Sequence, residues 1–131
     1  TATALEVLRM TQEEDLEPGL REKGAYFLKR LEELKARWKM VGDVSGMGLA
    51  LRMEMCQADG YTPNRELADR VFNEGLKGDI ELDGKRYGLV LDVGGYYKNV
   101  FTLAPSFTIT NEEIDLGLAL FEQLLRRCGA E

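Results

Sequence analysis

Side chains that could carry out chemistry are few in this 131-residue sequence. Histidine is absent, which removes the commonest general base near neutral pH and the commonest metal ligand. The two thiols, Cys56 and Cys128, are spaced for neither a CxxC motif nor a four-ligand zinc site, so both are expected to be buried. The carboxylates Glu112, Glu113 and Asp115 fall in the first turn of an expected helix, where negative charge complements the helix dipole. The sequence therefore predicts no catalytic residue and no metal site.

The glycine-rich segment VGDVSGMG at residues 41–48 could bind phosphate, because glycines expose backbone N–H groups to anions. Phosphate loops of nucleotide and dinucleotide sites run from a strand into a helix. Here a strand pattern follows the glycines, so we interpret the segment as a tight entry into that strand. Met53 and Met55 share the apolar face of the strand with Leu49 and Leu51, and this indicates core packing rather than a soft-metal site.

Residues 99–110 read NVFTLAPSFTIT, two β-like runs separated by Ala-Pro-Ser. Because Pro105 cannot donate to a strand ladder, we expect the break to turn the backbone at the rim of a substrate pocket. The preceding residues Tyr96, Tyr97, Lys98 and Asn99 form a polar, aromatic loop. Such a loop can bind a ligand or act only as a connector, and the sequence leaves both readings open.

Composition limits the class of protein. A net charge of -6 and a pI near 4.8 argue against nucleic-acid binding, which needs Lys and Arg to neutralise phosphates. The sequence contains neither an apolar run long enough to span a membrane nor a signal-peptide pattern, so no membrane association and a cytoplasmic location are expected. One core is enough for 131 residues with 44% hydrophobic content. The first residues, from Thr1, already have a helical pattern, which suggests a piece excised from a longer chain.

Periodicity predicts a single α+β domain with a small, three- to four-stranded, mostly antiparallel sheet and helices on one face. Capping boxes of the Thr-x-x-Glu type are expected at Thr11/Glu14 and Thr110/Glu113. Helices are expected at 2–10, 16–38, 63–76 and 111–128, and strands at 49–56, 79–82, 86–92 and 99–104.

Three local signals refine these boundaries. Pro18 is expected to lie near a helix terminus or at a kink, and Thr62-Pro63 is expected to begin a helix. Asp83-Gly84 between two β-like runs predicts a two-residue hairpin.

Several stretches, in order, resemble the C-terminal part of class III (omega-type) pyridoxal-phosphate aminotransferases. They are ALEVLRM, LKRLEELKARW, VGDVSGMGLALRMEM, GLVLDVGG and NVFTLAPSFTITNEEIDLGLALFEQLL. The similarity covers nearly the whole chain, and residues 77–87 resemble an insertion relative to the commonest members.

This resemblance implies a fold-type-I enzyme in which residues 1–131 form the small C-terminal domain, and the large cofactor-binding domain is absent. The small domain would pack on the large domain and across a homodimer. The enzyme would use pyridoxal 5'-phosphate to move an amino group from an amine or ω-amino acid to a 2-oxo acid. The family's Schiff-base lysine and cofactor-binding groups lie upstream, so no catalytic or cofactor-binding residue is assigned here, and the piece alone is expected to be inactive.

The resemblance also implies that this domain forms one wall of the substrate pocket. Many members carry Arg just before LAPPL, where its guanidinium can grip a carboxylate; this sequence has Thr102. Either Lys98 or Arg52 supplies the cation, or the substrate presents no carboxylate at that point. Ser45 likewise stands where the family pattern often has Arg, so Thr102, Lys98 and Ser45 are the substrate-pocket candidates.

A second interpretation is a free-standing α+β module that binds a ligand or partner through the loop at residues 96–99. It predicts a monomer without a large exposed apolar patch. An excised domain predicts bare apolar surface instead.

Overall fold

The computed structural model describes residues 1–13 and 15–129. The helices are α1 (Ala2–Glu13), α2 (Glu17–Arg37), α3 (Arg65–Leu76) and α4 (Asn111–Arg127). The strands are β1 (Val41–Met47), β2 (Ala50–Met55), β3 (Ile80–Leu82), β4 (Lys85–Tyr87), β5 (Asp92–Gly94) and β6 (Val100–Leu103). Four strands form one antiparallel sheet in the order β1-β2-β6-β5, and β3 and β4 pair as a separate two-stranded sheet. This confirms the predicted α+β architecture.

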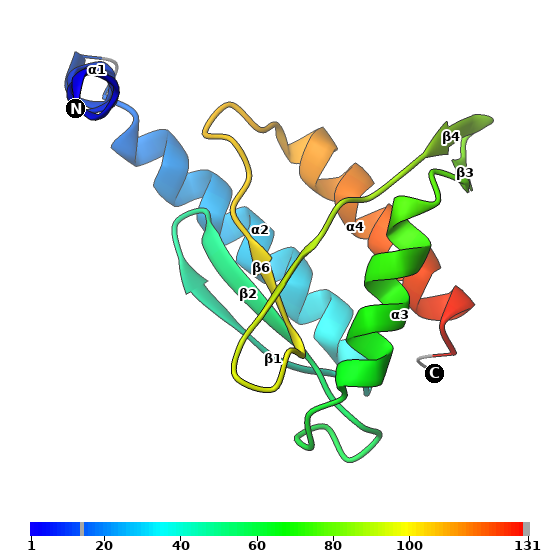
Figure 1. The fold of residues 1–131 in the computed structure, drawn as a ribbon. Coiled ribbons are helices and arrows are strands. Elements are labelled where there is room, and N and C mark those ends of the chain that lie inside the picture. Colours follow the sequence, from blue (N-terminus) through cyan, green and yellow to red (C-terminus); the bar gives the residue numbers. More distant parts are fainter. Residues whose placement is uncertain (14, 130–131) are drawn as a thin grey trace.

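The core lies between one face of the sheet and helices α2, α3 and α4. Figure 1 shows α2 running along the sheet with α4 and α3 beyond it, while α1 is set apart at the N-terminal end. Phe101 of β6 packs edge-on against Phe121 of α4, with ring centroids 5.5 Å apart. The predicted apolar face of β2 is confirmed, because Leu51, Met53 and Met55 are all buried.

Helix α4 begins and ends as its sequence predicts. The Thr110 side chain accepts from the Glu113 N–H, and the Glu113 carboxylate accepts from the Thr110 N–H, so the capping box is confirmed. Gly129 follows the helix with a φ of +67°, a left-handed conformation that glycine adopts without steric cost.

Two predicted helix starts are wrong. Thr11 lies inside α1, and its hydroxyl donates to the Val7 carbonyl at 2.7 Å instead of capping a new helix; Glu14 lies outside the described residues. Helix α3 is capped by Asn64, whose side chain accepts from the Leu67 N–H at 3.0 Å. Pro63 instead lies before the cap, in an isolated bridge with Cys56.

The glycine-rich segment is itself a strand, not only an entry into one. Strand β1 contains Gly42 and Gly46 and pairs with β2 through an irregular register. A side chain at Gly42 would overlap the Cys56 sulfur, and one at Gly46 would overlap the Ala50 carbonyl. The glycines therefore permit the close approach of β1 to β2 and its neighbours.

The Asp83-Gly84 hairpin is confirmed, since both residues have positive φ, +50° and +73°. The hairpin does not join the main sheet. The predicted strand 86–92 is divided: β4 ends at Tyr87, residues 88–91 are irregular, and β5 begins at Asp92. The Leu89 N–H is satisfied by the Gly75 carbonyl of α3 at 2.9 Å, which draws this segment away from the sheet.

The proline in NVFTLAPSFTIT does not interrupt a strand. Strand β6 ends at Leu103, so Pro105 removes no ladder hydrogen bond. Residues 107–110, predicted as β-like, form no strand and lead into α4. Pro18 lies in the first turn of α2, as predicted.

Candidate functional site

A row of four side-chain positions crosses the open face of the sheet, which is the face opposite helices α2, α3 and α4. The register pairs Ser45 with Arg52, Arg52 with Thr102, and Thr102 with Asp92. Directly paired residues of antiparallel strands point to the same face. Phe101, the neighbour of Thr102, is fully buried against the helices, so the row faces away from the core.

Arg52 is held toward β1 by its neighbours. Its Nε donates to the Ser45 hydroxyl at 2.9 Å, and its Nη2 donates to the Asp43 carboxylate at 3.3 Å. The Ser45 hydroxyl donates in turn to Asp43 at 3.1 Å. The Glu54 carboxylate lies 3.8 Å from Nη2. The guanidinium is therefore balanced by two carboxylates and positioned by a hydroxyl.

Asp92 and Thr102 occupy the other half of the row. Both residues are exposed. Within residues 1–13 and 15–129, neither the Asp92 carboxylate nor the Thr102 hydroxyl takes part in a hydrogen bond or ion pair. Sequence reasoning missed Asp92, because its only signal was a charged residue at the end of an apolar run; its position opposite Thr102 depends on the pairing of two strands.

The structure brings Ser45, Arg52 and Thr102 together but not Lys98. Lys98 is exposed in the β5–β6 loop, where its φ is +55° and its N–H donates to the Gly95 carbonyl at 3.3 Å. It lies before the first residue of β6, at the opposite end of that strand from Pro105. Arg52 is thus the cation nearest to Thr102 in the register, on the neighbouring strand.

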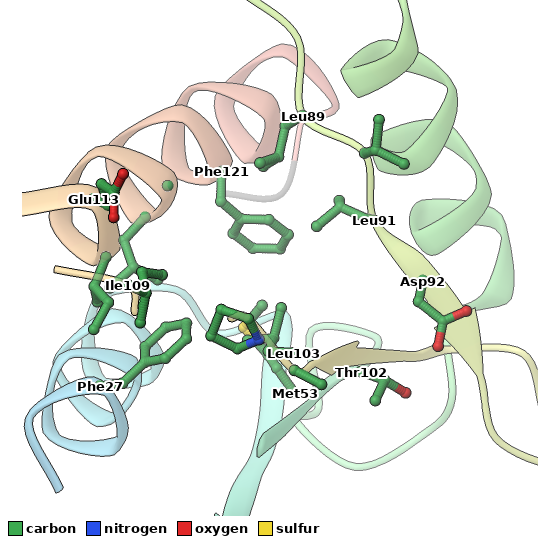
Figure 2. Close-up of a pocket in the computed structure, with 16 residues that line it drawn as sticks. Phe27, Met53, Leu89, Leu91, Asp92, Thr102, Leu103, Ile109, Glu113 and Phe121 are labelled. Carbon is green, nitrogen blue, oxygen red and sulfur yellow. The ribbon is translucent and has the colours of Figure 1, made fainter. Parts of the chain in front are cut away.

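Beside the polar row lies an apolar cavity of about 580 Å³ between the end of β6, the segment 89–92 and helices α2 and α4. Phe27, Met53 and Phe121 are among its lining residues. Pro105 borders it too, so the bent segment after β6 forms part of a cavity wall. Figure 2 shows Thr102 and Asp92 together at one edge, with their oxygens turned away from the apolar centre.

Two of the carboxylates at the start of α4, Glu113 and Asp115, have structural partners. Glu113 caps the helix. Asp115 accepts hydrogen bonds from the Tyr26 hydroxyl at 2.8 Å and from Arg30 Nε at 2.9 Å. Both hydrogen bonds lower the pKa of the Asp115 carboxyl, and the one from Tyr26 has the larger effect. Asp115 therefore ties α4 to α2, a role that the sequence did not predict.

The two thiols and the three methionines of this region differ in burial. Burial raises the pKa of both Cys56 and Cys128; Cys56 is fully buried as predicted, whereas Cys128 is only half-buried. Met47, unlike Met53 and Met55, is exposed. Across the described chain, no three Cys, Asp or Glu side chains are grouped so that they could hold a metal ion. Nor does any described helix have the length and apolar character required to cross a bilayer.

Comparison with known proteins identifies the family. The family described as Aminotransferase class-III matches residues 1–125. Alanine–glyoxylate aminotransferase 2 from Pongo abelii is 33% identical over 119 residues, which cover 91% of this chain and 22% of that protein. The chain thus spans 22% to 28% of the length of the curated relatives reported for it.

Solved structures share the fold of this chain. A phospholyase from Arthrobacter in complex with phosphoethanolamine superposes with a TM-score of 0.77 at 28% identity, covering 93% of this chain and 27% of that one. An amine transaminase from an uncultivated Pseudomonas species, in its PLP-bound internal aldimine form, gives 0.76 at 26% identity, covering 98% and 27%.

Proposed function

The chain belongs to the class III aminotransferase family, and from this membership we propose that it is the small C-terminal domain of a pyridoxal-phosphate-dependent aminotransferase. The whole enzyme would transfer an amino group from an amine or ω-amino acid to a 2-oxo acid. The observation that carries this proposal is the family match over residues 1–125, together with the small fraction of each relative that the chain spans.

Exposed apolar side chains support the assignment as part of a larger protein. Helix α1 has no buried residue, and Leu5 and Leu8 on it are 70% and 62% exposed. Met47 and Val90 are 85% and 81% exposed. A helix that buries none of its several large apolar side chains is typical of a surface that another protein covers. We propose that the large domain and a second subunit of a homodimer cover them.

We propose that this chain does not itself hold pyridoxal phosphate. The cofactor needs a lysine for its Schiff base and donors for its phosphate. The 580 Å³ cavity has no Lys or Arg in its lining, and its charged lining residues are the acids Asp92 and Glu113. The cofactor would therefore be bound by the remaining polypeptide, and no catalytic residue is assigned in this chain.

The contribution of this domain would be one wall of the substrate pocket. The open face of the sheet has the required properties, because its row of Ser45, Arg52, Thr102 and Asp92 presents polar groups on a rigid support. Thr102 and Ser45 remain the substrate-pocket candidates, with Arg52 as the neighbouring cation. Lys98 is a weaker candidate because it lies at the far end of β6. A cytoplasmic location and the absence of nucleic-acid and membrane partners stay predictions.

The proposal is tested by comparing the 131-residue chain with the full-length protein that contains it. The full-length protein should bind pyridoxal phosphate in stoichiometric amounts, with the absorbance of a lysine aldimine, and should transaminate an amine with a 2-oxo acid. The isolated chain should do neither. Saturable cofactor binding at one lysine of the isolated chain would contradict the assignment.

A second measurement separates this function from a free-standing module. The isolated chain should bind an apolar fluorescent dye or self-associate with increasing concentration, because its apolar surface is bare. A monomer that does neither at any concentration would favour a module acting through the loop at residues 96–99.

A further inference from the structure

The part of the open face around Thr102 is acidic. The charged residues within the four strands of the main sheet are Arg52, Asp43, Glu54 and Asp92. Arg52 is balanced by Asp43 at 3.3 Å and Glu54 at 3.8 Å, which leaves Asp92 without a cationic partner within the described residues. A free carboxylate thus lies directly opposite the hydroxyl of Thr102.

We propose that Asp92 and Thr102 bind a positively charged group of the substrate. The amino donor would then carry a second cation at the end remote from the reacting amine, as in an aliphatic diamine. This inference rests on the proposed function and specifies the substrate class for the same pocket wall.

The geometry of the pair suits an ammonium group. Side chains of directly paired residues on antiparallel strands have Cβ atoms about 5 Å apart, so one small cation can contact both. An ammonium has three donors and no acceptor. The Asp92 carboxylate and the Thr102 hydroxyl can each accept one of these hydrogen bonds, and the third remains for water.

Arg52 does not neutralise the charge of Asp92. Its Nε and Nη2 both point to Ser45 and Asp43 on β1, on the side away from Thr102. To neutralise Asp92, the guanidinium would have to leave these hydrogen bonds and cross the position of Thr102. A substrate carboxylate placed at Thr102 would meet the unpaired charge of Asp92, and like charges disfavour such binding.

The surroundings of the pair suit a hydrocarbon chain. Leu91 and Leu103, which are next to Asp92 and Thr102 in sequence, line the apolar cavity, and Figure 2 shows both acidic and apolar groups at this edge. A methylene chain can lie along this edge while its terminal ammonium contacts Asp92. The expected donor is therefore cationic at both ends and apolar between them.

The test uses the full-length enzyme and three donors of equal chain length: 1,4-diaminobutane, 1-aminobutane and 4-aminobutanoate, each with the same 2-oxo acid. The wild-type enzyme should have the highest kcat/KM for the diamine and the lowest for the amino acid. Asp92→Asn should raise KM for the diamine about fivefold, the ratio expected for one partly exposed ion pair. The KM of the Asp92→Asn variant for 1-aminobutane, and its kcat with the diamine, should change little.

Matched variants distinguish the effect of the Asp92 charge from an effect of altered structure. Glu112→Gln removes an exposed carboxylate of α4, outside the row, and should leave kcat/KM for all three donors unchanged. Asp92→Arg should shift the preference toward 4-aminobutanoate, because it reverses the charge opposite Thr102. Asp92 is exposed, so circular dichroism of each variant should match the wild type.

The possible outcomes distinguish the two proposals. An enzyme that turns over none of the three donors overturns the inference about Asp92, and it contradicts the proposed function too if the full-length protein does not bind pyridoxal phosphate. An active enzyme without a diamine preference, or one in which Asp92→Asn changes the KM of diamine and monoamine equally, overturns the inference about Asp92 and leaves the aminotransferase assignment intact.

Discussion

Gly24 of α2 lies against the backbone of Gly48, in the turn that joins β1 to β2. A Cβ atom at Gly24 would overlap the Gly48 carbonyl oxygen. The contact fixes the distance between the first large helix and the edge of the sheet that carries Ser45 and Asp43. The helix therefore supports the polar row from the opposite face.

Gly24→Ala should destabilise the domain by about 1–3 kcal/mol, because the added methyl group would push α2 away from a backbone atom. Urea unfolding followed by circular dichroism measures the change. Gly19→Ala in the same helix is the matched control, since a Cβ there would contact nothing within 4 Å; it should be neutral or stabilising by up to about 1 kcal/mol. Equal effects of the two substitutions would contradict the proposed contact.

Phe101 and Phe121 should be energetically coupled. Their rings meet edge-on between β6 and α4, and such pairs contribute about 0.5–1.5 kcal/mol beyond their buried area. A double-mutant cycle with Phe101→Leu and Phe121→Leu measures the coupling from the free energies of unfolding. Strict additivity of the two substitutions would show that the edge-on contact contributes nothing.

The two threonines predicted to cap helices should behave differently. Thr110→Ala should cost about 1 kcal/mol, because it removes the acceptor for the Glu113 N–H. Thr11→Ala should cost much less, since the Thr11 hydroxyl only returns to the Val7 carbonyl within the exposed helix α1. Thermal unfolding of both variants measures the difference. A larger loss of stability at Thr11 than at Thr110 would support the capping box predicted at Thr11.

The hydrogen bonds that Asp115 of α4 accepts from α2 should make the stability of the domain depend on pH in the acidic range. The pKa of Asp115 is lowered by the hydrogen bonds from Tyr26 and Arg30, so the carboxylate form is favoured in the folded state. Its contribution is fully present above the unfolded-state pKa of about 3.9 and is lost as the pH falls through the lower, folded-state pKa.

Asp115→Asn should therefore be less stable than the wild type near neutral pH, and the difference should shrink below about pH 4. Tyr26→Phe removes only the hydroxyl donor and should show the same trend with a smaller amplitude. Urea midpoints measured between pH 2 and 7 test this. If the difference in urea midpoint stayed constant over this pH range, protonation of Asp115 would not be coupled to its hydrogen bonds with Tyr26 and Arg30.

The two thiols should react at different rates. Burial raises the pKa of both, which lowers the fraction of reactive thiolate at neutral pH. Because Cys56 is buried and Cys128 only half-buried, labelling with a thiol reagent should give a faster and a slower phase. Cys128→Ser should remove the faster phase, and Cys56→Ser the slower one. In denaturant both thiols should react at one common rate.

Much of the fold could be predicted because its signals are local. The alternation that ends at Met55 defined one face of β2, and the 3.6-residue period around Leu31 and Leu118 defined α2 and α4. The turn chemistry of Asp83-Gly84 and the cap at Thr110 act over two to four residues. Signals of this range need no information about the rest of the chain.

Strand β1 was not predicted because its glycines interrupt the alternation of apolar and polar side chains. Its role depends on what lies beside it: Gly42 packs on Cys56 and Gly46 on the β2 backbone. The misplaced start of α3 has a similar cause, since Pro63 is held in a bridge with Cys56 and the cap moves to Asn64.

The sequence by itself determined the family, the helices, the hairpin and the residue types available to the site. Only the tertiary structure decided which of those residues meet. Ser45, Arg52, Thr102 and Asp92 come from four strands, and the register between strands depends on the packing of the whole sheet. A shift of one residue in β5 would turn Asp92 toward the core, so its place opposite Thr102 follows from long-range pairing and not from any local pattern.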